Sequence, residues 1–226
     1  MKTFKSSRGP FTERPFYTDQ EVESMCSDEL RSVGLMPNVP GPIRIDRFIE
    51  KRFKIVPCYE PLPDGILGLT QFSDSGPAKI IVSEELEQNA TVVNERRIRS
   101  TLAHEAGHCM LHTHLFAFAA TGTPLFGDHT DPKAPKVLCR EPQAYGGDWW
   151  EFQANLAMSM LLLPRQLVQA ALVPFLRPAG LLSIPDLHEE QRPEAVKSLV
   201  DVFDVNPAMV KIRLEKLYPA NASGRL

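Results

Sequence analysis

The spacing of apolar residues predicts a largely helical chain with a small sheet in its first half. Apolar positions recur at helical spacing in the segments 18–33, 43–52, 97–113, 149–163, 193–203 and 207–218, and a further helix is expected to start at Pro164. Short runs rich in β-branched and aromatic residues predict strands at 53–56, 65–72 and 79–82. The last two strands flank the turn 74–77, so we expect them to pair antiparallel. The pattern therefore predicts an α+β fold.

Local signals place the ends of several elements and divide the chain. Thr18-Asp19-Gln20-Glu21 has the form of a capping box, and Gly34 closes the helix that it starts. Asn94 is expected to cap the helix that contains 97–113. A break at 204–206 separates the last two helices, an arrangement shared with helix-turn-helix units. We expect an irregular leader at 1–17, a main domain at 18–175 and a C-terminal helix pair at 189–218.

Composition and charge exclude several classes of protein. The chain has 226 residues, 43% of them hydrophobic and 23% charged, which is ordinary for a soluble globular protein. A net charge of −3 gives no overall attraction to nucleic acid or to an anionic membrane. Four cysteines without C-x-x-C spacing indicate a reducing compartment, and the N-terminus lacks the apolar region of a signal peptide. We expect a cytoplasmic protein without a membrane segment.

The helix at 97–113 contains the pattern H-E-x-x-H. Residues four apart lie on one face of a helix, so His104 and His108 can direct both imidazoles at one metal ion. Glu105 lies beside that pair, where it can take a proton from an attacking water without being a ligand. Two neutral imidazoles and a carboxylate suit Zn²⁺ with one position left open. The motif therefore predicts zinc hydrolase chemistry with Glu105 as the catalytic base.

A third ligand has to come from elsewhere in the chain. Glu151 is the leading candidate, because Ala154 in the same E-x-x-A-N segment is small enough for that helix to pack closely on the first. His114 would complete a metzincin-like histidine spacing, but that pattern needs a glycine where the chain has Leu111. Asp148, Glu141 and His129 remain further alternatives. His112 lies about 12 Å along the helix axis from the first histidine, so we expect it to pack beside the site rather than bind the metal.

Other polar residues are candidates for supporting roles. Asn155 is expected to hydrogen-bond a metal-ligating side chain. Tyr145, His129 and His188 are candidates for stabilising an oxyanion. The proline- and glycine-rich segment 115–148 is predicted to be a long loop, and a loop of this kind can cover a cleft.

Two segments resemble the ImmA/IrrE-type metallopeptidases. They are T-L-A-H-E-A-G-H-C-M-L-H at 101–112 and W-E-F-Q-A-N-L-A-M-S-M-L-L-L-P at 150–164, and the segments 65–72 and 202–217 are also similar. Gln153, Ala157 and Met158 depart from the family's pattern. The resemblance implies a zincin-like minimal metallopeptidase, with His104, His108 and Glu151 as zinc ligands and Glu105 as the base. It also implies an endopeptidase that cleaves a helix-turn-helix repressor in a bacterial stress response or a mobile element.

A second class of function stays open at this point. The C-terminal helix pair could make the protein a regulatory module that binds protein or DNA, with a metal site that does not turn over. Lys197, Lys211, Arg213 and Lys216 supply positive charge there, but Glu194, Asp201, Asp204 and Glu215 offset it. Direct DNA binding is therefore not expected.

Overall fold

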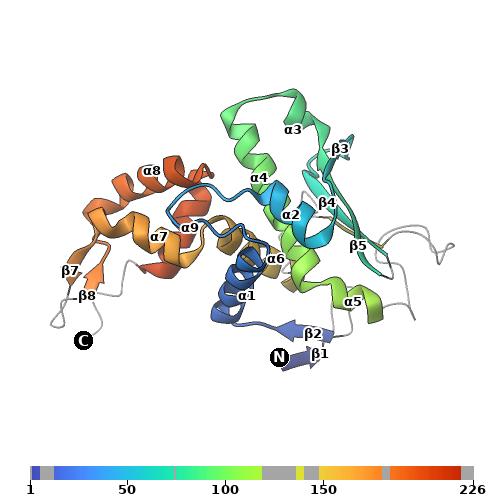
Figure 1. Cartoon of the computed structure of the whole chain (residues 1–226), viewed down its shortest axis with the longest axis horizontal. Helices are drawn as coiled ribbons and strands as arrows, with labels where there is room; N and C mark the ends of the chain where they lie inside the picture. Colours follow the sequence, from blue (N-terminus) through green and yellow to red (C-terminus); the bar gives the residue numbers. More distant parts are fainter. Residues whose placement is uncertain are drawn as a thin grey trace.

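The computed structural model describes residues 2–5, 13–73, 75–118, 136–139, 148–179 and 184–219, which form a mixed α+β structure (Figure 1). The helices in these ranges are α1 (Asp19–Ser32), α2 (Ile45–Phe53), α3 (Glu84–Gln88), α4 (Val92–Leu111), α5 (Thr113–Phe118), α6 (Trp149–Leu162), α7 (Arg165–Leu172), α8 (Arg192–Phe203) and α9 (Pro207–Leu217). Short 3₁₀ turns lie at Val173–Phe175 (η2) and Glu189–Gln191 (η3). The α+β class predicted from the apolar spacing is confirmed.

The main sheet has the strand order β3-β5-β4-β6. The strands are β3 (Cys58–Glu60), β4 (Gly68–Ser73), β5 (Gly76–Ser83) and β6 (Lys136–Cys139). β4 pairs antiparallel with β5, as predicted, and also with β6, whereas β3 runs parallel to β5. The small sheet that we expected to be antiparallel is therefore mixed, because of β3. The chain between β3 and β5 contains β4, so β3 and β5 can lie side by side and point the same way.

Two segments differ from their predicted structure. Residues 53–56 form no strand, because α2 continues to Phe53 and Lys54 ends it in the left-handed conformation with φ 62°. Residues 1–17 are not simply an irregular leader, since β1 (Lys2–Lys5) pairs antiparallel with β2 (Glu13–Phe16). The rings of Phe4 and Phe16 meet edge to face with centroids 6.0 Å apart, a cross-strand contact that stabilises the hairpin. A second hairpin joins β7 (Arg177–Ala179) and β8 (Ile184–Asp186).

The helix ends follow local chemistry. The predicted capping box is present, with Thr18 and Glu21 each bonding to the other's backbone amide. The prediction for α4 was wrong by three residues: Thr91 is the N-cap, and its hydroxyl accepts a hydrogen bond from the Asn94 amide. The Asn94 side chain donates instead to the Asn89 carbonyl. Similarly, Pro164 caps α7 rather than being its first residue.

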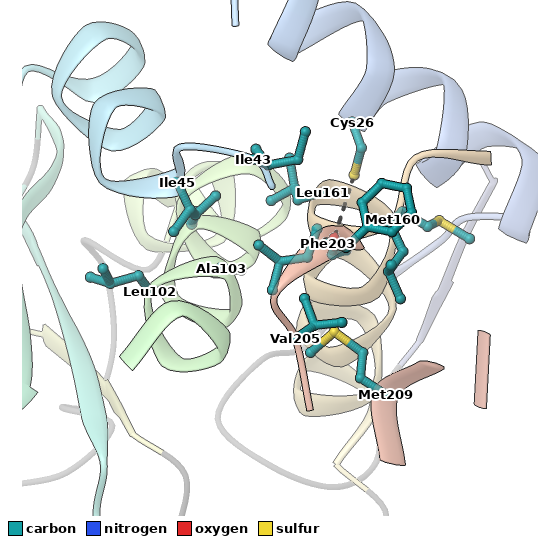
Figure 2. Packing of buried hydrophobic residues seen from close by; sticks show 14 of the residues in the cluster. Cys26, Ile43, Ile45, Leu102, Ala103, Met160, Leu161, Phe203, Val205 and Met209 are labelled. Carbon is teal, nitrogen blue, oxygen red and sulfur yellow. Dashed lines mark hydrogen bonds between the residues drawn. The ribbon is translucent and has the colours of Figure 1, made fainter. Parts of the chain in front are cut away.

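The hydrophobic core surrounds α6, which lies in the centre of the molecule between α4, α1 and the C-terminal helices (Figure 1). Figure 2 shows buried side chains from α1, α4, α6 and the α8–α9 segment meeting there. Cys26 of α1 points at α6, where its Sγ lies 3.8 Å from the Ala157 carbonyl oxygen. One core cluster includes residues from both 18–175 and 189–218. The core is therefore continuous across the domain boundary that we predicted.

Among the helices that the structure describes, none is by itself long and apolar enough to span a membrane. Within the described ranges, one pair, Trp149–Leu162 and Arg165–Phe175, would pass by length and composition together, and it is bent by 51°.

Candidate metal centre

α4 brings the two motif histidines to one point. His104 and His108 are buried, and their Nε2 atoms lie 3.0 Å apart. Both lie on one side of the helix because they are four residues apart, which is about one turn. Two imidazole nitrogens at this distance can share one ion.

Glu151 completes the group from the first turn of α6. One of its carboxylate oxygens lies 3.1 Å from His104 Nε2, and the other lies 3.3 Å from His108 Nε2. The ligand atoms of His104, His108 and Glu151 all lie within 4.8 Å of one another, so this group could hold a metal ion. Of the candidates for the third ligand, the structure brings Glu151 to the histidines.

The close contact of α4 and α6 makes this meeting possible. A Cβ atom added at Gly107 would lie 3.0 Å from the Ala154 carbonyl oxygen and 3.1 Å from the Ala157 Cβ. Both neighbours on α6 are alanines, and both are fully buried. The two helices therefore approach through their smallest side chains, and the predicted role of Ala154 in close packing is confirmed.

A chain of hydrogen bonds determines which nitrogen of His108 carries its proton. The Pro15 carbonyl can only accept, so the Gln153 amide nitrogen, 2.8 Å away, donates to it. The Gln153 carbonyl oxygen then faces His112 Nε2 at 3.1 Å and accepts from it. Burial, together with the neighbouring His108, holds the pKa of His112 well below its ordinary value, so this ring is neutral. Its Nδ1 is therefore an acceptor.

The remaining step in the chain concerns His108. Its Nδ1 lies 2.9 Å from His112 Nδ1, and since that atom is an acceptor, His108 Nδ1–H must be the donor. The lone pair of His108 is consequently on Nε2, which faces His104 and Glu151. A metal-ligating histidine needs its lone pair on the atom that binds the ion. His112 thus packs beside the predicted ligand His108 and contacts it through Nδ1.

Asn155 supports the other histidine. Its Oδ1 lies 3.2 Å from His104 Nδ1, so the amide carbonyl can accept a hydrogen bond from the N–H at that ring position. This contact favours a lone pair on His104 Nε2. Asn155 therefore contacts a predicted ligand, as expected from its position in the E-x-x-A-N segment.

These contacts fit a bound cation. The His108 Nε2 lone pair points at a carboxylate and at a second imidazole nitrogen. Because these atoms all carry partial negative charge, they repel one another. The Glu151 oxygens are buried, and they accept no hydrogen bond from the described chain beyond their contacts with the two imidazoles. A metal ion at this point would satisfy all three groups.

Glu105 lies beside the ligands with a partner of its own. Thr70 of β4 donates a hydrogen bond of 2.6 Å from its hydroxyl to Glu105 Oε2. Burial raises the pKa of Glu105, although His104, His108 and Thr70 act in the opposite direction. Gly68, two residues before Thr70 on the same face of β4, leaves room for this carboxylate, since a Cβ there would lie 3.1 Å from Glu105 Oε1. Strand and helix thus hold the carboxylate between them.

A cavity of about 760 Å³ opens beside the metal-binding group, and both His104 and Glu105 line it. Its other walls come from β4 and the segment before it, from α6, and from α9 with the residue that precedes it. This volume is within the range of ligand-binding pockets. A ligand in the cavity would lie beside His104 and Glu105.

The remaining predicted site residues lie outside the metal-binding group and the cavity lining, or outside the described residues. His114 is half-buried in α5 and Asp148 precedes α6, but neither belongs to the metal-binding group. His188 is exposed at the start of η3 and does not line the cavity. Glu141, Tyr145 and His129 lie outside the described residues, as does most of the predicted loop 115–148.

Thr70 and Gln153 are the two supporting residues that sequence reasoning missed. Thr70 could have been found from the alternation in β4, where Gly68, Thr70 and Phe72 occupy the buried face. A threonine hydroxyl on a buried strand face needs a hydrogen-bond partner. For Gln153, the one signal in the sequence is its departure from the family's pattern.

Comparison with models of known protein families and with curated proteins finds no match for this chain.

Proposed function

We propose that this protein is a zinc-dependent endopeptidase. The observation that carries the proposal is that Glu105 lines the same cavity as His104, a member of the His104–His108–Glu151 group. Two imidazoles and one carboxylate are a ligand set typical of catalytic zinc, which leaves a position open for water or substrate. A purely structural zinc site would have four protein ligands and no adjacent unbound base.

The chain's own residues would divide the chemistry of hydrolysis among them. A bound zinc ion would polarise the scissile carbonyl and lower the pKa of the attacking water. Glu105 would accept a proton from that water and transfer it to the leaving amine, so the peptide bond becomes a carboxyl group and an amine. Thr70, whose hydroxyl bonds to one carboxylate oxygen, would hold Glu105 in place and leave its other oxygen for the proton.

For the substrate, we propose a repressor-type transcription factor, most simply a helix-turn-helix repressor. The support is the resemblance of 101–112 and 150–164 to the ImmA/IrrE-type metallopeptidases. Direct DNA binding through α9 is disfavoured, because Arg213 pairs with Glu23 and Lys216 pairs with Asp19. Two basic groups that are already neutralised contribute little to phosphate binding.

The first experiment measures metal content in the purified wild-type protein, in Glu151→Ala and in His114→Ala. We expect about one zinc ion per chain in the wild type. Glu151→Ala should lose the metal, because a ligand is removed, and His114→Ala should keep it. Loss of metal from His114→Ala with retention in Glu151→Ala would contradict the ligand assignment.

The second experiment tests catalysis with Glu105→Gln. This variant should keep its zinc but lose at least about 100-fold in cleavage of a proteome-derived peptide mixture, because an amide cannot accept the proton. Cleavage is measured as new N-termini by mass spectrometry. Equal activity in the variant would refute the role of Glu105, and no cleavage by the zinc-loaded wild type would favour a binding protein.

A further inference from the structure

One wall of the cavity is built by α9 and the residue before it. Asn206, Ala208, Met209, Ile212 and Lys216 all line the cavity, together with Phe152 and Met158 of α6. Ile212 is 60% exposed and Phe152 is 45% exposed, although both are large and apolar. Exposed apolar side chains that share a cavity with a reactive centre are typical of substrate contacts.

α9 is held in place from two other helices. Arg213 is buried, pairs with Glu23 of α1, and donates a 3.0 Å hydrogen bond to the Leu163 carbonyl. Lys216 bonds to Asp19 of α1 at 2.8 Å, and its ammonium lies 5.7 Å from the centre of the Phe152 ring. The contacts join α9 to α1 and α6. The apolar wall is therefore preformed and needs no folding step on binding.

The charges around the cavity restrict what it can accept. Glu105 is the sole acidic residue among the described residues that line it, and this side chain belongs to the metal centre. Arg97 and Lys216, both exposed, are the lining residues that carry positive charge. Lys216 is paired with Asp19, so a basic substrate side chain would lose hydration there and meet the positive charge of Arg97. An apolar side chain would meet Ile212, Met158 and Phe152 instead.

We propose that the part of the cavity between α6 and α9 is a subsite for a large apolar side chain of the peptide substrate, next to the bond that is cleaved. The inference rests on the proposed peptidase function. Its support is the continuity of this apolar wall with His104 and Glu105 in one cavity. Ile212 is the residue that determines specificity, because it is the most exposed apolar side chain on that wall. The C-terminal helices thus contribute to substrate recognition.

The test compares zinc-loaded wild type with Ile212→Glu on a proteome-derived peptide mixture. The wild type should cut at sites enriched in Leu, Phe or Met at one fixed position beside the bond. Ile212→Glu should cut the best of these sites roughly tenfold more slowly. It should also accept Lys or Arg at that position, because the new carboxylate provides a partner. Since Ile212 is exposed, its replacement should leave the melting temperature unchanged.

Val173→Glu is the matched control. Val173 is 66% exposed and does not line the cavity, so the same change there should leave the cleavage pattern as in the wild type. An unchanged pattern in Ile212→Glu would overturn the subsite while leaving the peptidase proposal intact. A pattern that changes equally in Val173→Glu would also overturn it.

A binding measurement separates failure of the subsite from failure of catalysis. Capped peptides that differ only in one central residue (Phe, Leu, Ala, Glu or Lys) are added to the zinc-loaded Glu105→Gln protein, and binding is followed by competition with a fluorescent peptide. Phe and Leu should bind at least several-fold tighter than Lys, and Ile212→Glu should remove that preference. No preference for Phe or Leu would overturn the inference, whether or not the wild type cleaves peptides.

Discussion

At the scale of single residues, Gln153 lies outside the predicted ligand group but helps to set the tautomer of His108, which belongs to that group. Its amide is oriented by the Pro15 carbonyl of β2, and this orientation is passed through His112 to His108. The identity of each donor follows from the previous one, starting from a carbonyl that cannot donate. The N-terminal hairpin is thereby coupled to the metal centre.

Removal of the Gln153 amide should weaken metal binding without removing a ligand. Gln153→Ala leaves His112 free to exchange its two tautomers, so His108 no longer has its lone pair held on Nε2. We expect the affinity for zinc to fall by about 10- to 100-fold. Competition with a chromophoric chelator measures the affinity.

Gln20→Ala is the control for this change, because Gln20 is an exposed glutamine on α1. Its affinity for zinc should equal that of the wild type. A Gln153→Ala protein with unchanged affinity would show that the hydrogen-bond chain from Pro15 does not prepare the ligand.

At the scale of elements, the candidate metal centre depends on how closely α4 and α6 approach. Gly107 lies between the motif glutamate and the second histidine, and it faces Ala154 and Ala157 of α6. The ligands of α4 and the ligand of α6 reach one point because no larger side chain separates the helices there. The close packing of α4 on α6 therefore sets the geometry of the site.

Gly107→Ala tests whether α4 and α6 are in close contact at this point. The substitution has two opposed effects on the free energy of unfolding. Alanine in a helix interior is favoured over glycine by about 1 kcal/mol. The added methyl group would, however, lie 3.0 to 3.2 Å from backbone atoms of Ala154, and overpacking of this kind costs about 1–3 kcal/mol. We expect a net loss of about 1 kcal/mol in the free energy of unfolding, measured by urea denaturation, together with weaker zinc binding.

Val93→Ala on the same helix is the comparison, since Val93 is 55% exposed and its replacement changes helix propensity alone. That variant should be as stable as the wild type or slightly more stable. If Gly107→Ala behaved in the same way, the helices could not be in close contact at this point.

At the scale of the whole molecule, Asp204 joins the C-terminal helices to the metal-binding helix. It ends α8 in the left-handed conformation with φ 51° and pairs with Arg96 and Arg99 of α4. Burial raises the pKa of Asp204, but the two arginines outweigh it and the carboxyl pKa is lower than its ordinary value of 3.8. The charged form of Asp204 is therefore stabilised by folding.

The stability that Asp204 contributes should depend on pH. A lowered folded-state pKa gives a contribution that is complete above the unfolded-state pKa and is lost as the pH falls through the folded-state value. Asp204→Asn keeps a residue that tolerates the left-handed conformation but removes the charge. We expect it to lower the free energy of unfolding by about 1 kcal/mol at pH 7.

The difference between wild type and Asp204→Asn should shrink as the pH falls below about 4, where the unfolded carboxyl becomes protonated. Chemical denaturation at a series of pH values measures it. A difference that stayed constant from pH 7 to pH 3 would mean that the charge of Asp204 is not responsible.

What the sequence determined by itself is local. The apolar period predicted most helices, the capping box at Thr18 located the start of α1, and the H-E-x-x-H spacing brought His104 and His108 to one face. These features depend on residues within one or two turns of one another, and their physics is contained in the segment. The error in the leader arose where pairing with another segment decided the outcome, and the error at 53–56 arose because α2 continues to Phe53.

What only the tertiary structure decided is contact between distant segments. Glu151 competed with other candidates until α6 packed on α4. The bond from Thr70 to Glu105, the chain through Gln153 and the cavity wall supplied by α9 join residues far apart along the chain. No periodicity encodes such contacts, because they follow from which helix and strand faces are buried against each other in the common core.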